Sequence, residues 1–229
     1  MHERKSWIFS RGVYTRYPFQ ANTYGLPQPI VEECVLGFLK TLHRPETEVL
    51  GAKPSFRDWS LRTFGEGICR HFMFPYNEKL WRRPLDQLTT EWQGRFVPKP
   101  VASEVLFGAL RDQKKMFGYN ATFRYPRRGA IQALPDALAR RLKSGQVRLG
   151  CAALRVDLAE RVATIEGLGE VSFKRLVNTL PLVDFLDIAE PLPARIHAAR
   201  EKLRYNTVYC LNFGVGRAQV SDRHWIYFP

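Results

Sequence analysis

The sequence predicts an α/β fold of the mixed α+β kind, in which a helix-rich segment precedes a strand-rich one. Between residues 27 and 118, apolar side chains recur in several stretches at the spacing of amphipathic helices. After residue 119, short runs rich in β-branched and aromatic residues alternate with turn residues, which is typical of strands. The length of 229 residues and the 45% hydrophobic content suffice for one large domain or two small ones.

Turn residues and periodicity predict the first elements. Two short strands, residues 7–9 and 13–15, flank the turn Ser10-Arg11-Gly12. Apolar residues at helical spacing predict a helix over residues 30–42. A second helix is expected to begin at Phe56, with Ser55 as its N-cap. A third, over residues 64–75, is expected to end at Pro75, because proline disrupts a helix interior.

The remaining elements are shorter. Three prolines predict that residues 84–100 are mostly turn, and a short helix is expected over 101–110. Helical spacing returns over residues 131–142 and 193–203. The predicted strands are residues 121–125, 147–149, 152–158, 161–165, 170–173, 174–178, 205–213 and 224–228.

Composition limits the classes of function. The four cysteines form no C-x-x-C pair and the five histidines show no metal-ligand or triad spacing, so no metal site is expected. No apolar run reaches the roughly 18 residues of a membrane-spanning helix, and no secretory signal follows the basic N-terminus. A cytoplasmic location and no membrane contact are therefore the default expectations.

The formal net charge of +13 leaves three interpretations open. The excess can be spread over solvated faces, or it can attract a small anionic ligand such as a nucleotide diphosphate. A nucleic-acid partner is the third and least favoured, because Lys and Arg are scattered and form no block of five or six.

Two aromatic segments are candidates for gripping a flat ligand. In an extended chain Tyr17 and Phe19 share a face, and Gln20 can pair with the edge of a base. Further along, Phe72 and Trp81 accompany Asn77, whose amide has both a donor and an acceptor for an imide edge such as that of uracil. Taken alone, each segment is more typical of packed core aromatics than of a ligand site.

Single residues add weaker signals. Arg95 follows Gly94 between turn-like elements, and its guanidinium suits phosphate oxygens, although a lone arginine is usually a surface residue. A predicted strand containing Asn120 leads into a turn at Gly129, where glycine permits close backbone approach to a ligand. Gly214-Val-Gly216 is rejected as a dinucleotide fingerprint because no helical pattern follows it. Gly65-Glu-Gly67 is rejected as well.

Several motifs occur together in a fixed order. They are Tyr17-Pro-Phe-Gln20, Leu26-Pro27, Phe56-x-x-Trp59, the segment from Phe72 to Trp81, Gly94-Arg95, Asn120-Ala-Thr-Phe-Arg124, Lys174-Arg-Leu-Val-Asn-Thr179 and Trp225-Ile-Tyr-Phe-Pro229. In this order and spacing the chain resembles the eukaryotic-type UDP-galactopyranose mutases. These are FAD enzymes within a wider group that includes amine-oxidase-like and protoporphyrinogen-oxidase-like flavoproteins.

The resemblance implies roles for individual residues. It implies that Tyr17, Phe19, Gln20, Phe72 and Asn77 contact uridine, that Trp81 and Tyr205 line the substrate site, and that Asn120 contacts sugar or phosphate. It implies Arg95 as a diphosphate ligand, with a second arginine expected near residues 215–217, where Arg217 is the candidate. For FAD, it implies backbone approach at the Gly129 turn and a main-chain contact to adenine at Ala153. No side chain is expected to act as a catalytic acid or base.

The resemblance also implies an organisation. Residues 1–26 would link to the sheet of the substrate site, 27–118 would form a helical substrate domain, and 119–229 would complete the substrate sheet and part of a FAD-binding domain. The glycine-rich dinucleotide fingerprint of such domains has no counterpart here, so the chain is expected to be truncated at both ends and inactive alone.

The implied activity is FAD-dependent interconversion of the pyranose and furanose forms of a UDP-sugar. Two alternatives stay open: a flavin oxidoreductase of amine-oxidase or protoporphyrinogen-oxidase type, and a non-catalytic basic binding module.

Overall fold

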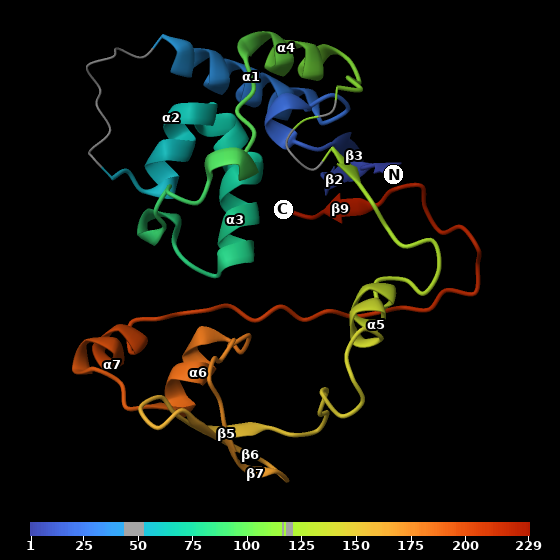
Figure 1. Ribbon diagram of the computed structural model, residues 1–229. Helices are drawn as coiled ribbons and strands as arrows, with labels where there is room; N and C mark the ends of the chain where they lie inside the picture. Colours follow the sequence, from blue (N-terminus) through green and yellow to red (C-terminus); the bar gives the residue numbers. More distant parts are fainter. Residues whose placement is uncertain (44–52, 116, 118–120) are drawn as a thin grey trace. The chain divides into compact units, whose positions relative to one another are not determined.

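The structure is a computed structural model that describes residues 1–43, 53–115, 117 and 121–229 (Figure 1). The chain divides into two compact units, one formed by Met1–Tyr125 with Tyr209–Pro229 and the other by Pro126–Val208. The mixed α/β class predicted from the sequence is confirmed. The expected boundaries at residues 26 and 118 concern the domains of a flavoenzyme, and they stay predictions.

The first unit combines helices with two small sheets. Its helices are α1 (Gln28–Leu42), α2 (Phe56–Ile68), α3 (Phe74–Trp81) and α4 (Ala102–Leu110), and a π turn (Cys69–Met73) joins α2 to α3. Short 3-10 turns span Phe19–Ala21, Leu85–Gln87 and Gly94–Phe96. Its strands are β1 (His2–Glu3), β2 (Ser6–Ser10), β3 (Val13–Arg16), β4 (Thr122–Phe123) and β9 (Trp225–Tyr227).

The main sheet of this unit joins the two ends of the described chain. Strand β2 pairs antiparallel with β3 and parallel with β9, in the order β3-β2-β9, and Figure 1 shows β9 beside β2. In this register Ile8 lies opposite both Thr15 and Tyr227. The strands predicted at residues 7–9, 13–15 and 224–228 are therefore confirmed. The pairing also brings Tyr227 next to residues near the N-terminus.

Glycines allow α1 and α2 to cross at close range. A Cβ added at Gly65 would overlap the carbonyl of Gly37, and one at Gly67 would overlap the carbonyl oxygen of Glu33. Gly65 has φ +77°, a conformation that other residues rarely adopt, and it kinks α2. The Gly65-Glu-Gly67 motif is therefore a helix-packing feature, which agrees with its rejection as a nucleotide fingerprint.

The prediction that Pro75 ends a helix was wrong. Pro75 lies in the first turn of α3, where its missing N–H and fixed φ are tolerated. The π turn before it has a bond from the backbone N–H of Phe74 to the carbonyl of Cys69. After the kink at Gly65 the chain therefore stays helical from Glu66 to Trp81, with the irregular turn placed just before the proline.

The second unit is smaller and more exposed. It contains a four-stranded sheet in the order β7-β6-β5-β8, built from β5 (Ala153–Asp157), β6 (Val162–Ile165), β7 (Gly169–Ser172) and β8 (Ala189–Glu190). Its helices are α5 (Ala133–Ala139), α6 (Leu182–Ile188) and α7 (Ala194–Arg200). A small core of Val156, Ala163 and Ala189 holds the sheet.

Three predicted strands were wrong: residues 147–149, 174–178 and 205–213 form no strand in the described chain. The reason is clearest for the last segment, where Tyr209 is 90% exposed and Phe213 81%. Strand propensity reflects packing against neighbouring strands, and this alternating apolar pattern has none in the described structure.

Candidate functional site

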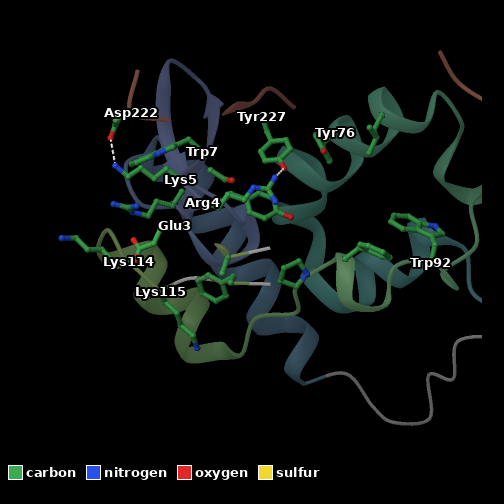
Figure 2. A pocket seen from close by; sticks show the side chains of 18 of the residues that line it. Glu3, Arg4, Lys5, Trp7, Tyr76, Trp92, Lys114, Lys115, Asp222 and Tyr227 are labelled. Atoms are coloured by element: carbon green, nitrogen blue, oxygen red, sulfur yellow. Dashed lines mark hydrogen bonds and ion pairs between the residues drawn. The ribbon is translucent and has the colours of Figure 1, made fainter. Parts of the chain in front are cut away.

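The first unit contains a cavity of about 760 Å³. Its wall comes from the N-terminal segment and β2, from α3, from the turn around residues 92–98, from β9, and from Lys114, Lys115, Phe117 and Ala121 (Figure 2). Segments far apart in the sequence therefore meet here, mainly because β9 pairs with β2. This volume is in the range of pockets for small molecules and cofactors.

Three tyrosines form one part of the wall, which we call the tyrosine wall: Tyr17, Tyr76 and Tyr227. The rings of Tyr17 and Tyr227 lie 5.1 Å apart at 31°, and Tyr76 meets Tyr227 edge to face at 5.6 Å and 86°. Burial, together with Tyr227, raises the pKa of Tyr76 to about 12, while Arg4 opposes the shift. The Tyr76 hydroxyl therefore keeps its proton and can donate a hydrogen bond to a ligand.

A stack of rings supports this wall from behind. Phe19 and Phe72 stack at 5.0 Å and 6°, and Phe72 and Tyr76 at 5.1 Å and 7°. Phe19 is fully buried and Phe72 is 3% exposed. The two aromatic segments singled out in the sequence thus converge, but of their rings it is Tyr17, Tyr76 and Trp81 that reach the cavity.

The two predicted amides are occupied by the protein itself. Gln20 is buried and its Nε2 donates to the carbonyl of Pro98 at 2.7 Å. Asn77 is buried and its Nδ2 donates to the carbonyl of Met73 at 2.7 Å. Neither residue lines the cavity in this structure, so their contact with a base stays a prediction.

A cationic end faces the tyrosine wall and consists of Arg4, Lys5, Arg16, Lys114 and Lys115. Figure 2 shows Lys5 directed to Asp222 and Arg4 to Tyr227, whose hydroxyl accepts from Arg4 Nη2 at 3.0 Å. Arg16 is paired with Asp112, and Lys115 with Glu104. Arg4 and Lys114 have no carboxylate partner among the described residues, and the wall also holds the carboxylate of Glu3, which offsets part of the positive charge at this end.

Some donors on this part of the wall have no acceptor within the described chain. They are Arg4 Nε, Ser6 Oγ and Trp7 Nε1, all buried. A buried donor without a partner costs roughly 1–3 kcal/mol. These three atoms are closed off from solvent, so it is the cations without a carboxylate partner, Arg4 and Lys114, that make this end suitable for an anionic ligand.

An indole pair forms the other end. Trp81 and Trp92 lie 5.1 Å apart at 57°, and both line the cavity together with Phe96. Trp81 is 36% exposed. Flat aromatic surfaces that face a cavity suit the apolar face of a sugar or another ring.

Sequence reasoning did not find the cationic end, Trp92 or Tyr227 as individual site residues. The cations lie at positions 4, 5, 16, 114 and 115, and no local pattern links them. The pairing of β2 with β3 places Arg16 beside the N-terminal segment, and the chain after α4 adds Lys114 and Lys115.

The other predicted residues are not among the described residues of this wall. The side chain of Arg95 and the whole of Asn120 fall outside the described residues. Arg217 is exposed and its Nη2 donates to the carbonyl of Val220 at 3.2 Å. Tyr205 belongs to the second unit and is 74% exposed. Their roles stay predictions.

The two predicted flavin contacts, Gly129 and Ala153, lie in the second unit. Gly129 has φ +78° and Ala130 follows with φ +49°, so an open turn precedes α5. Ala153 and Arg155 pair with β6 on one side of β5, while β8 on the other side pairs only with Val156 and Asp157. The contacts of Gly129 and Ala153 with a flavin stay predictions.

Two kinds of feature are absent from the described residues. They contain no group of three or more His, Cys, Asp or Glu side chains that could hold a metal ion. No helix in the described part of the chain is long and apolar enough to cross a membrane. No regular helix follows Gly214-Val-Gly216, in agreement with its rejection as a nucleotide fingerprint.

Comparison with known proteins gives a similar fold. No family model matches the chain. The crystal structure of reduced UDP-galactopyranose mutase superposes with a TM-score of 0.77 at 29% sequence identity over 88% of this chain. The chain spans 43% of the length of that protein. The fold is therefore similar to that of the mutase.

Proposed function

We propose that this chain is the substrate-binding part of a FAD-dependent enzyme that acts on a UDP-sugar and resembles UDP-galactopyranose mutase. The observation that carries the proposal is the composition of one cavity, which combines a tyrosine wall, a cationic end and an indole pair. The fold similarity to the mutase at 29% identity supports it.

Each part of the cavity matches one part of such a ligand. The tyrosine wall offers flat surfaces to the uracil ring, and the protonated Tyr76 hydroxyl offers a donor. The cationic end offers charge-assisted hydrogen bonds to a diphosphate. Trp81 and Trp92 offer surfaces to the sugar. No side chain is assigned as a catalytic acid or base.

The residues of this chain would hold and orient the nucleotide sugar and stabilise the charge of the departing diphosphate. Reduced flavin, when bound, supplies the nucleophile for the interconversion of ring forms. Gly129 and Ala153 would contribute backbone contacts to it. The glycine fingerprint that usually anchors the diphosphate of FAD is absent from this sequence.

A calorimetric titration with UDP, UMP, uridine and CDP tests the proposal. We expect UDP to bind more tightly than UMP and uridine, because the cationic end meets the diphosphate. We expect UDP to bind more tightly than CDP if the site distinguishes uracil from cytosine. Tyr17→Ala should weaken UDP binding about tenfold, the loss of roughly one aromatic contact of 1–1.5 kcal/mol. Tyr24→Ala is the matched control, since Tyr24 is 49% exposed and does not line the cavity.

Other outcomes point to other functions. Binding of FAD without any response to millimolar UDP would favour a flavin oxidoreductase. Steeply salt-dependent binding of RNA or DNA in place of UDP would favour a basic binding module. Either result contradicts the proposal.

A further inference from the structure

The π turn between α2 and α3 decides which face of α3 points to the cavity. A π turn contains one residue more than the corresponding α-helical turn, and such turns are rare and often functional. Each residue of an α-helix advances the chain by about 100° around the axis, so losing the extra residue would rotate α3 by about that amount. Tyr76 would then leave the tyrosine wall.

The local sequence does not explain why the extra residue is kept. Pro75 has no N–H for the carbonyl of His71, four residues earlier, so a regular α turn gains no hydrogen bond there. The missing hydrogen bond makes the α turn less stable but adds no interaction that stabilises the π turn. The π turn is favoured by the buried packing of Cys69, Phe72 and Met73 and by a polar contact from outside the segment.

Helix α1 supplies that contact. Glu33 Oε2 lies 2.9 Å from His71 Nε2 and accepts from Arg70 Nη1 at 3.0 Å, so one carboxylate oxygen holds two consecutive residues of the π turn. Both hydrogen bonds, with the His71 bond first, hold the pKa of Glu33 below its usual value. The carboxylate is therefore charged at neutral pH.

The backbone places Glu33 for this task. Its carbonyl oxygen packs against Gly67, where even a methyl group would overlap it. The main chain of Glu33 is therefore fixed against α2 one turn before Arg70 and His71. The side chain can reach the π turn only because the glycines let the two helices approach this closely.

A continuous series of contacts leads from the π turn to the cavity. Phe72, the next residue after His71, stacks on Phe19 on one side and on Tyr76 on the other. Tyr76 contacts Tyr227, whose hydroxyl accepts from Arg4. A change in the π turn is thus transmitted to the tyrosine wall through packed rings.

We propose that Glu33 and His71 are positioning residues for the cavity: their hydrogen bond keeps the π turn and thereby fixes Tyr76 on the tyrosine wall. Neither residue lines the cavity. The effect on UDP rests on the proposed function, whereas the effect on Tyr76 does not.

Four variants of the full chain test the proposal: His71→Phe, His71→Gln, Glu33→Gln and the double variant Glu33→Gln/His71→Phe. Glu32→Gln is the matched control, because Glu32 is the neighbouring exposed carboxylate on α1 and contacts only Gln28 by side-chain hydrogen bond in the described chain. Two quantities are measured, the dissociation constant for UDP and the titration of the Tyr76 ring by NMR with ring-labelled tyrosine.

We expect His71→Phe to weaken UDP binding about tenfold and to shift the Tyr76 titration from about 12 toward the ordinary tyrosine value of 10.0. His71→Gln, which keeps a hydrogen-bond donor, should retain most of the wild-type UDP affinity and most of the raised Tyr76 titration. The double variant should be no worse than Glu33→Gln alone, because the two residues act through one contact. Glu32→Gln should match the wild type.

The outcomes separate this proposal from the function. If the wild type does not bind UDP, the proposed function is wrong and the Tyr76 titration alone decides the positioning role. An unchanged Tyr76 titration in folded His71→Phe and Glu33→Gln overturns the proposal. The proposal is also wrong if His71→Gln shifts the Tyr76 titration as far as His71→Phe does. If His71→Phe does not fold, Glu33→Gln and His71→Gln give the same decision.

Discussion

Tyr17 and Phe19 show what local spacing can and cannot predict at the scale of single residues. Their separation by two positions predicted a shared face, as in a strand. In the structure β3 ends at Arg16 and a 3-10 turn begins at Phe19, so Tyr17 lines the cavity while Phe19 is buried beneath it. The aromatic residue types pointed to a site in this segment. The direction of each ring depends on the backbone, which is set by the packing of Phe19 against Phe72.

The Tyr76 hydroxyl should make folding stability depend on alkaline pH. Its pKa is about 12 in the folded protein and near the ordinary 10.0 in the unfolded chain, so its contribution is complete below pH 10. Between these values the unfolded chain releases this proton first, and the folded state loses stability as pH rises. After allowance for the partial exposure of the ring, we expect a loss of about 1 kcal/mol from this group.

Urea unfolding of the wild type and Tyr76→Phe, at about pH 9 and about pH 11, measures this contribution. The wild type should lose about 1 kcal/mol more than Tyr76→Phe over this interval, whereas Tyr24→Phe should follow the wild type. Equal losses in the wild type and Tyr76→Phe would mean that the Tyr76 hydroxyl is not buried against the cavity wall.

At the scale of elements, periodicity predicted α1, α2, α4 and the β2–β3 pair, because each has a clear apolar face or turn signal. It missed the continuation through Pro75, since one residue letter does not reveal whether proline stands inside a helix or in its first turn. It also missed that Gly65 and Gly67 serve a helix crossing, because that requires the position of Glu33 on another helix.

Replacement of Pro75 by alanine should separate stability from binding. Alanine restores an N–H that can bond to the carbonyl of His71, so the α turn competes with the π turn. We expect unfolding free energy to change by less than about 1 kcal/mol, while UDP affinity falls about threefold to tenfold as Tyr76 leaves the wall in part of the population.

Pro29→Ala is the matched control, because Pro29 also lies in the first turn of a helix but follows no π turn. It should leave UDP affinity unchanged. Urea unfolding and calorimetric titration of both variants provide the comparison, and a Pro75→Ala protein with wild-type affinity would contradict the role given to the π turn.

At the scale of the whole molecule, the sequence predicted a basic protein but not where its charge acts. Of the five cations at the cavity, Lys5, Arg16 and Lys115 are paired with carboxylates, and the described chain offers none to Arg4 and Lys114. The net charge of +13 is therefore mostly dispersed, and its local effect depends on Arg4 and Lys114, offset in part by the carboxylate of Glu3.

Salt dependence turns this distribution into a test. Ligand binding that involves about two unpaired cations should lose affinity with a slope of roughly 1–2 in a plot of log affinity against log salt concentration. A nucleic-acid partner that spans the dispersed cations would neutralise many phosphates and give a slope of several units. We expect the shallow slope for UDP, measured by calorimetry between about 50 and 500 mM NaCl.

Lys114→Ala should reduce that slope by about one, whereas Lys53→Ala should not, because Lys53 is 85% exposed and does not line the cavity. A slope that is equally steep in both variants would place the binding on the dispersed surface charge and not in the cavity.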